Sequence, residues 1–193
     1  MKVTLAKTAG FCFGVQRAVD TVYRVLEEEH EKPLDEQRSI YTYGPIVHNE
    51  TVIQKLAAEG VQVLESEEEL ATLHDGIVII RAHGVPKHIY ELLEKQRVEA
   101  VDASCPFVQK IQRLVQQHTA AGEEVFVTGN PEHPEVIGIM GWAEGGISAI
   151  PDIETAEKLP NGEGRSVVVV SQTTFNIDKF KLIIDILKKK HYY

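Results

Sequence analysis

The segment Ile77-Val78-Ile79-Ile80, followed by Arg81-Ala82-His83-Gly84, decides the fold class of this 193-residue chain. Four consecutive apolar β-branched residues are typical of a strand that is buried on both faces, and such strands belong to parallel sheets covered by helices. The polar, glycine-containing segment after them predicts a loop at the carboxyl end of the strand, where α/β proteins bind their ligands. Residues 77–84 therefore indicate an α/β fold and a first candidate site.

Strand-like and helix-like segments alternate on both sides of this stretch. Strands are predicted at residues 3–5, 40–43, 61–64, 77–80, 100–103, 124–128, 147–150 and 167–170, the last of them buried. Helices are predicted at residues 15–29, 50–58, 67–73, 86–95, 107–121, 134–142, 153–159 and 177–190. Such βαβ alternation predicts parallel sheets. Because the pattern restarts near residue 100, we expect two similar α/β lobes, residues 1–100 and 101–193.

Composition excludes several classes of protein. The chain has 20 basic and 29 acidic residues and a formal net charge of −9, which repels nucleic acid and anionic membranes. No apolar run approaches the ~20 residues of a membrane span, and the first ten residues are too few and too polar for a secretory signal. Two cysteines exclude a disulfide scaffold and a self-contained four-cysteine metal site. We expect a cytoplasmic protein with reduced thiols and no nucleic-acid or membrane partner.

Chemically capable side chains gather in six loops, each expected after a predicted strand, at residues 10–14, 44–49, 81–84, 104–106, 129–135 and 171–174. They include Cys12, His48, His83, Cys105, His133, Glu135, Thr173 and Thr174. Because the carboxyl ends of parallel strands meet at one edge, we expect these side chains to face a common cleft between the lobes. The acidic runs at 27–31 and 65–69 are expected to be solvated faces.

Both cysteines have a structural and a functional interpretation. Cys12 lies between two phenylalanines and suits a small core residue, but Gly10 and Gly14 favour an exposed tight turn. Cys105 precedes Pro106, a good first residue of a helix, so its thiol is expected at a helix amino terminus that favours the thiolate form. Such thiolates suit a soft metal or an iron–sulfur cluster.

The histidines divide into two groups. His48 and His83 either cap nearby carbonyls or donate to a ligand, whereas His133 and Glu135, held between prolines, are either a stiff turn or a proton-transfer pair. The remaining five are expected to be solvated or packing residues: His30, His74, His88, His118 and His191.

Two further motifs leave choices open. Thr173 and Thr174 either serve the site or cap the last helix, a role that Asn176 fills equally well. The absence of G-x-G-x-x-G and Walker patterns disfavours a dinucleotide or ATP, and leaves a smaller anion at helix amino termini.

Six motifs taken together resemble the 4-hydroxy-3-methylbut-2-enyl diphosphate reductase family, the iron–sulfur enzymes of the last step of the non-mevalonate isoprenoid pathway. They are GFCFGVQRA (10–18), GPIVHN (44–49), RAHGV (81–85), DASCPFV (102–108), EHPEVIG (132–138) and SQTTF (171–175). The motifs follow the order and spacing of the family over essentially the whole chain.

The resemblance implies three α/β lobes around a central [4Fe–4S] cluster that is held by three cysteines. It implies reductive dehydration of the hydroxylated diphosphate to isopentenyl and dimethylallyl diphosphate, with electrons from a ferredoxin- or flavodoxin-type donor. Matched by motif, the cluster ligands would be Cys12 and Cys105, and the diphosphate-binding residues would be His48, His83 and His133. Glu135 would deliver protons to the leaving hydroxyl, and Thr173 would hydrogen-bond to that hydroxyl and to Glu135.

The chain departs from the family pattern in its third lobe and its third cysteine, neither of which is present. We therefore expect two lobes of a truncated form with little or no activity alone. The first alternative is a cluster-free α/β module that binds a small phosphorylated ligand or a partner lobe. The second is a hydrolase with zinc on Cys12, Cys105 and one histidine.

Overall fold

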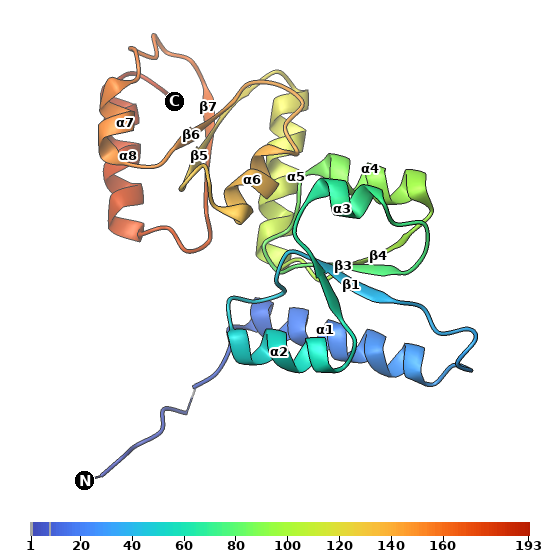
Figure 1. Ribbon diagram of the computed structural model, residues 1–193. Helices are drawn as coiled ribbons and strands as arrows, with labels where there is room; N and C mark the ends of the chain where they lie inside the picture. Colours follow the sequence, from blue (N-terminus) through green and yellow to red (C-terminus); the bar gives the residue numbers. More distant parts are fainter. Residues whose placement is uncertain (1, 8) are drawn as a thin grey trace. The chain divides into compact units, whose positions relative to one another are not determined.

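A computed structural model describes residues 2–7 and 9–193, which form two compact units (Figure 1). The first unit is Met1–Ala82 with Gln96–Cys105, and the second is His83–Lys95 with Pro106–Tyr193. A single division near residue 100 was expected, whereas residues 83–95 belong to the second unit and residues 96–105 to the first. The cause is hydrogen bonding: residues 99–102 pair with the first sheet, while Val85 accepts hydrogen bonds from Gln112 and Trp142 of the second unit.

The first unit is built on a four-stranded parallel sheet in the order β2-β1-β3-β4. Its strands are β1 (Ile40–Tyr43), β2 (Gln62–Leu64), β3 (Ile77–Ile80) and β4 (Glu99–Asp102). All four residues of β3 are buried, which confirms the prediction made from its β-branched run. A central strand has a neighbour on both edges and helices on both faces, so it needs apolar side chains throughout.

Helices α1 (Phe13–His30) and α2 (Glu50–Ala58) cover one face of this sheet, and α3 (Glu67–Ala71) lies on the other (Figure 1). The apolar stripe of α1 packs with Leu56 of α2 against the inward residues of β1 and β3. The side chain of Asn49 accepts a hydrogen bond from the Val52 N–H and so caps α2. A helix needs such a partner because its first N–H groups have no acceptor within the helix.

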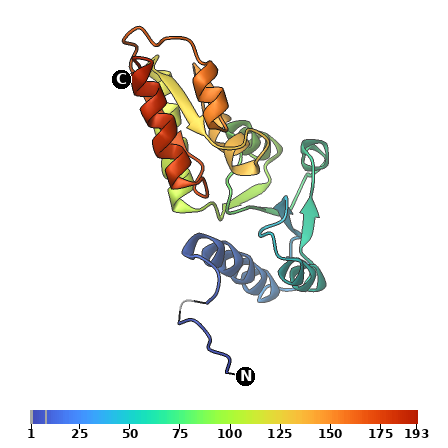
Figure 2. The same ribbon diagram turned by 90° about the vertical axis from the view of Figure 1, so that its left-hand side faces the viewer.

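The second unit contains a three-stranded parallel sheet in the order β6-β5-β7, made of β5 (Glu124–Thr128), β6 (Ile147–Ile150) and β7 (Val167–Ser171). Helices α5 (Pro106–Ala120) and α6 (Pro134–Met140) cover one face, and α7 (Ile153–Lys158) and α8 (Ile177–Lys189) cover the other (Figure 2). Helix α4 (Lys87–Gln96) completes the elements. Along β5, Val125 and Val127 pack in one core cluster and Phe126 in the other, as alternating strand geometry requires.

Three expectations need correction. Residues 3–5 form no strand, and the side chains of Val3 and Leu5 are 81% and 82% exposed, because within the described part of the chain they pair with no sheet edge. In β7 only Val170 is buried, because this strand lies at the edge of its sheet. The acidic run 27–31 is not wholly solvated, since Glu29 is buried. Among the described residues, no helix is long and apolar enough to cross a membrane.

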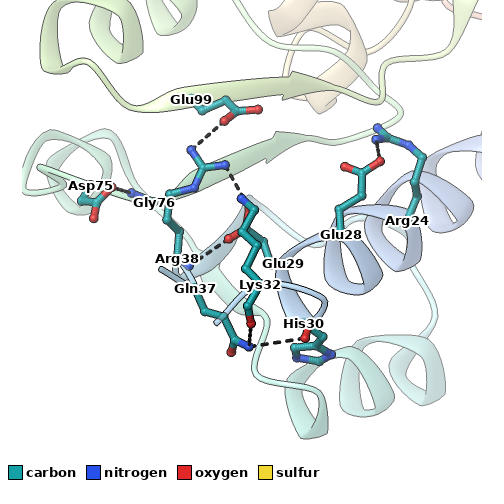
Figure 3. A network of polar contacts seen from close by, with 10 residues as sticks. All are labelled: Arg24, Glu28, Glu29, His30, Lys32, Gln37, Arg38, Asp75, Gly76 and Glu99. Carbon is teal, nitrogen blue, oxygen red and sulfur yellow. Dashed lines mark hydrogen bonds and ion pairs between the residues drawn. The ribbon is translucent and has the colours of Figure 1, made fainter. Parts of the chain in front are cut away.

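Glu29 lies at the centre of an ion-pair network that joins the end of α1 to the sheet (Figure 3). Its carboxylate accepts hydrogen bonds from Lys32 Nζ, from the Arg38 N–H at 2.9 Å and from Arg38 Nη2 at 3.0 Å. Arg38 Nη1 also reaches the Glu99 carboxylate of β4 at 2.7 Å. Burial alone raises the pKa of Glu29, but the hydrogen bonds from Lys32 and Arg38 outweigh it and lower that pKa from 4.5 to about 2.

We predict that Glu29→Gln lowers the free energy of unfolding by about 3 kcal/mol, because it removes one partner of a buried ion pair. In the unmodified chain, the contribution of Glu29 is complete above pH 4.5 and is lost as the pH falls towards 2, because the folded-state pKa is depressed. Urea denaturation at several pH values measures both effects. Glu28→Gln is the matched control, because Glu28 is half exposed and pairs with Arg24 along the helix surface; its expected change is below ~0.5 kcal/mol.

Candidate active site

Cys12 is the residue that precedes the first turn of α1. Its backbone is extended, with φ −65° and ψ 161°, and its side chain makes no capping hydrogen bond. The residue is exposed and its thiol is free. The exposed turn expected from Gly10 and Gly14 is therefore present, although the described residues before it, 2–7 and 9–11, form no strand. A thiol in this position is available to an external ligand.

Cys105 lies in the same unit as Cys12 and follows β4. It is half-buried and free, its N–H donates to the Ala82 carbonyl at 2.9 Å, and α5 begins directly after it at Pro106, as predicted. A Cβ atom added to Gly14 would lie 2.6 Å from the Cys105 sulfur. The Cys105 thiol therefore rests against the first turn of α1, close to Cys12, and only glycine allows this approach.

His48 is exposed and lies in the loop that joins β1 to α2. The loop begins at Gly44, whose φ of +69° favours glycine, and an added Cβ there would clash with the Arg81 guanidinium. Burial lowers the pKa of Arg81, while Tyr43 and Glu65 act in the opposite direction. Arginine stays protonated at neutral pH, so the Arg81 side chain places a positive charge next to Gly44, where the His48 loop begins.

His83 and His133 are neighbours in the second unit. Their rings are 5.5 Å apart between centroids, with an interplanar angle of 82°. His133 Nδ1 accepts a hydrogen bond from the Glu135 N–H at 3.1 Å. In a neutral ring that accepts at Nδ1, the proton lies on Nε2, so His133 presents an N–H donor on its other side. Two adjacent imidazoles can bind an anion such as a phosphate group.

Close backbone packing explains why these two histidines meet. An added Cβ on Gly138 of α6 would lie 3.2 Å from the Gly84 carbonyl carbon. The buried Gln112 side chain donates to the carbonyls of Val85 and Gly138, at 3.3 and 3.4 Å, and so joins the two segments. Glycine at position 138 leaves room for this approach, and the Gln112 amide holds the two segments together through their carbonyls.

Glu135 and Thr173 form the second pair of this unit. Glu135 is 2% exposed, and its carboxylate accepts two hydrogen bonds from Thr173, from the N–H at 2.5 Å and from Oγ1 at 2.8 Å. Thr173 itself is exposed. Asn176, rather than either threonine, caps α8 by accepting from the N–H groups of Asp178 and Lys179. The Thr173 hydroxyl thus connects a buried carboxylate with the surface of the site.

Gln172 is a residue to which the sequence analysis assigned no role. Its Oε1 accepts from the Asn130 N–H at 3.2 Å, and its Nε2 donates to Thr174 Oγ1 at 3.0 Å. It therefore fixes the loop before α6, the helix that carries Glu135, against the loop before α8, which carries Thr173. A polar residue directly after a predicted strand was the available signal, but its partner Asn130 is 42 residues away in the sequence.

The predicted site residues fall into two sets. The first unit holds Cys12, His48 and Cys105, and the second holds His83, His133, Glu135 and Thr173. Four of the other histidines are exposed, and His118 is half-buried and paired with Glu123. In the described part of the chain, no three His, Cys, Asp or Glu side chains are grouped as ligands of one metal ion. The common cleft between lobes stays a prediction.

Two parallel sheets covered by helices, with free thiols, adjacent imidazoles and a buried carboxylate near the strand ends, define an α/β protein. The chain belongs to the LytB protein family, whose model matches residues 3–192.

Two curated relatives of the chain are each named 4-hydroxy-3-methylbut-2-enyl diphosphate reductase. The relative from Caldanaerobacter subterraneus subsp. tengcongensis is 40% identical over 190 residues, which are 98% of this chain and 63% of the relative. The relative from Thermoanaerobacter sp. strain X514 is 42% identical over 191 residues, with the same coverage of both chains. The chain thus spans about 63% of the length of these relatives.

Two solved structures are similar to the chain. One is the E-1-hydroxy-2-methyl-but-2-enyl-4-diphosphate reductase from Plasmodium falciparum, with a TM-score of 0.83, 32% identity and coverage of 95% of this chain and 55% of that one. The other is an (E)-4-hydroxy-3-methyl-but-2-enyl diphosphate reductase described as the terminal enzyme of the non-mevalonate pathway. Its TM-score is 0.80 at 33% identity, over 98% of this chain and 65% of that one.

We predict that Thr173→Val lowers the free energy of unfolding by about 1–3 kcal/mol, because a buried carboxylate loses a hydroxyl donor. A double-mutant cycle with Glu135→Gln isolates the pair, and thermal and urea denaturation supply the four free energies. The expected coupling between the two positions is about 1 kcal/mol or more. Additive effects of the two substitutions would contradict the hydrogen bond as a stabilising contact.

Proposed function

We propose that this chain carries part of the site for reductive dehydration of 4-hydroxy-3-methylbut-2-enyl diphosphate to isopentenyl diphosphate and dimethylallyl diphosphate. The observation that carries the proposal is the hydrogen bonding of buried Glu135 to Thr173. Glu135 is two residues after His133, which belongs to the histidine pair. An acid–base group beside an anion-binding group is what a hydroxylated diphosphate requires. The name shared by the relatives, and the family match over residues 3–192, support the same activity.

The reaction breaks the bond between the allylic carbon and its hydroxyl oxygen. It consumes two electrons and two protons; one proton leaves with the oxygen as water and the other ends on carbon. Glu135 is suited to supply the first proton, and the Thr173 hydroxyl, which donates to Glu135 Oε2, is suited to hydrogen-bond to the substrate hydroxyl as well. We propose that a ferredoxin- or flavodoxin-type donor supplies the electrons one at a time.

Cys12 and Cys105 are the proposed ligands of a [4Fe–4S] cluster. Both thiols are free, and the Cys105 sulfur lies against the turn of α1 that follows Cys12, which fits two ligands of one cluster. The sequence has two cysteines, so the third thiolate of a three-cysteine cluster has to come from outside these 193 residues. When bound, such a cluster supplies single electrons and an iron that polarises the hydroxyl oxygen. The free thiols also support the proposed cytoplasmic location.

The diphosphate is the proposed ligand of His48, His83 and His133. His133 offers an Nε2–H donor because its Nδ1 accepts from the Glu135 N–H, and the His83 ring lies beside it. His48 is exposed in the loop before α2. Hydrogen-bond donors of this kind bind phosphate oxygens, and more strongly when the imidazole is protonated.

The second candidate is a cluster-free α/β module that binds a small phosphorylated ligand. The histidine pair favours it, because two imidazoles can bind phosphate oxygens without iron. It differs from the reductase in one testable respect, the requirement for the two thiols.

Anaerobic reconstitution with ferrous iron and sulfide separates the two functions. We expect the protein reconstituted and desalted with a small external thiol, which supplies the third thiolate, to retain iron and acid-labile sulfide, with visible absorption that changes when the hydroxylated diphosphate is added. Cys12→Ser and Cys105→Ser should each remove this iron and sulfide, because each removes one ligand. Iron analysis, sulfide analysis and titration calorimetry with inorganic pyrophosphate are the measurements.

Pyrophosphate binding with no thiol-dependent iron would overturn the reductase and support the cluster-free module. Zinc in place of iron and sulfide would overturn both. Glu135→Gln, which lies in the second unit and is not a thiol ligand, should retain the iron and sulfide of the unsubstituted chain.

A further inference from the structure

Arg17 connects α1 to the loop that carries Cys105. It lies one and a half turns after Cys12 on the same helix, and its Nη1 donates to the Ser104 carbonyl oxygen at 2.7 Å. Ser104 is fully buried and directly precedes Cys105. The bond therefore links residues that are 87 positions apart in the sequence and both close to a cysteine.

Other hydrogen bonds tie the Cys105 loop to the sheet, and one of them runs from the Ala103 N–H to the Ile80 carbonyl at 3.0 Å. The Ser104 N–H donates to Asp102 Oδ1 at 2.8 Å, at the end of β4. The Cys105 N–H donates to the Ala82 carbonyl, which follows β3. These three bonds do not reach α1, so the position of the loop relative to the helix depends on the Arg17 contact and on packing.

The packing brings the two thiols to one end of α1. The Cys105 sulfur lies where a Cβ of Gly14 would be, within 2.6 Å. Cys12 is two residues earlier, and two trans peptide units separate Cα atoms by no more than ~7 Å. A shift of the Cys105 loop away from the helix would therefore change the separation of the thiols directly.

We infer that Arg17 is a positioning residue that fixes the separation of the Cys12 and Cys105 thiols by holding the Ser104 carbonyl against α1. A hydrogen bond from a charged donor to a carbonyl is stronger than one between neutral groups, so the loss of Arg17 should loosen the loop. The purpose of a fixed thiol pair rests on the proposed cluster-binding function, but the separation can be measured with no iron present.

Dibromobimane tests the inference because it becomes fluorescent only after both of its bromines have been displaced by thiols. The chain has two cysteines, so intramolecular fluorescence reports this pair alone. We expect Arg17→Met to slow the bridging step about tenfold, and Arg17→Lys to recover part of the rate, because an ammonium group can also donate to the carbonyl. Arg24→Met is the matched control, since Arg24 lies two turns further along α1, is half exposed and pairs with Glu28; its rate should equal that of the unsubstituted chain.

Alkylation by monobromobimane in the Cys12→Ser and Cys105→Ser backgrounds measures the reactivity of each thiol alone, and the Arg17 variants should leave it within about twofold. Should Arg17→Met not fold by circular dichroism, Arg17→Gln takes its place, with the same expected loss, because its amide is too short to reach Ser104. Equal bridging in the Arg17→Met and unsubstituted chains, an equal loss in Arg24→Met, or no bridging in the unsubstituted chain overturns the inference. Iron retention is scored separately, so a failure of the proposed function leaves this result intact.

Discussion

The parallel pairing of β3 with β1 on one side and β4 on the other is the constraint on which the first unit depends. All four residues of β3 are buried, so a polar side chain placed in this strand would disturb the packing around β1 and β4 as well. Because the three strands run in one direction, their carboxyl ends lie at one edge of the sheet. The loops that leave this edge contain His48 and Cys105, and the Ala82 carbonyl after β3 holds the Cys105 N–H. The position of the thiol thus follows from backbone hydrogen bonding several residues away.

In the second unit, the loops at the carboxyl ends of its own strands are held together by side chains. Its loops after β5 and β7 are tied together by Gln172, and the same two loops bring Glu135 onto Thr173. A carboxylate that is 2% exposed requires hydrogen-bond donors, and Thr173 provides two of them. In both units, then, a chemically capable group is held by a partner that is far away in the sequence and that is fixed by the sheet.

Most secondary structure was predictable because it depends on local patterns. The bounds of β1, α2, β3, β5 and β6 agree with the periodicity and with residues such as Gly60, which ends α2 with a φ of +91°. The failures concern non-local partners: residues 3–5 have strand composition but no pairing edge, and Glu29 looks solvated until Lys32 and Arg38 are placed around it. The assignment of residues 83–95 to the second unit and of residues 96–105 to the first could not be predicted for the same reason, since the contact of Gln112 with Val85 exists only in the folded chain.

The candidate site residues were identified by their motifs, but their mutual contacts required the structure. The histidine pair and the Glu135–Thr173 bonds join loops that are separated by 38 to 50 residues, which no local pattern specifies. The most direct test of the account is the response of the eight histidines to inorganic pyrophosphate, followed by NMR of the ¹⁵N-labelled imidazoles. We predict saturable shifts for His48, His83 and His133, with unchanged signals for the other five. Equal shifts of all eight rings, or a response confined to the other five, would contradict the assignment of these three residues to a diphosphate site.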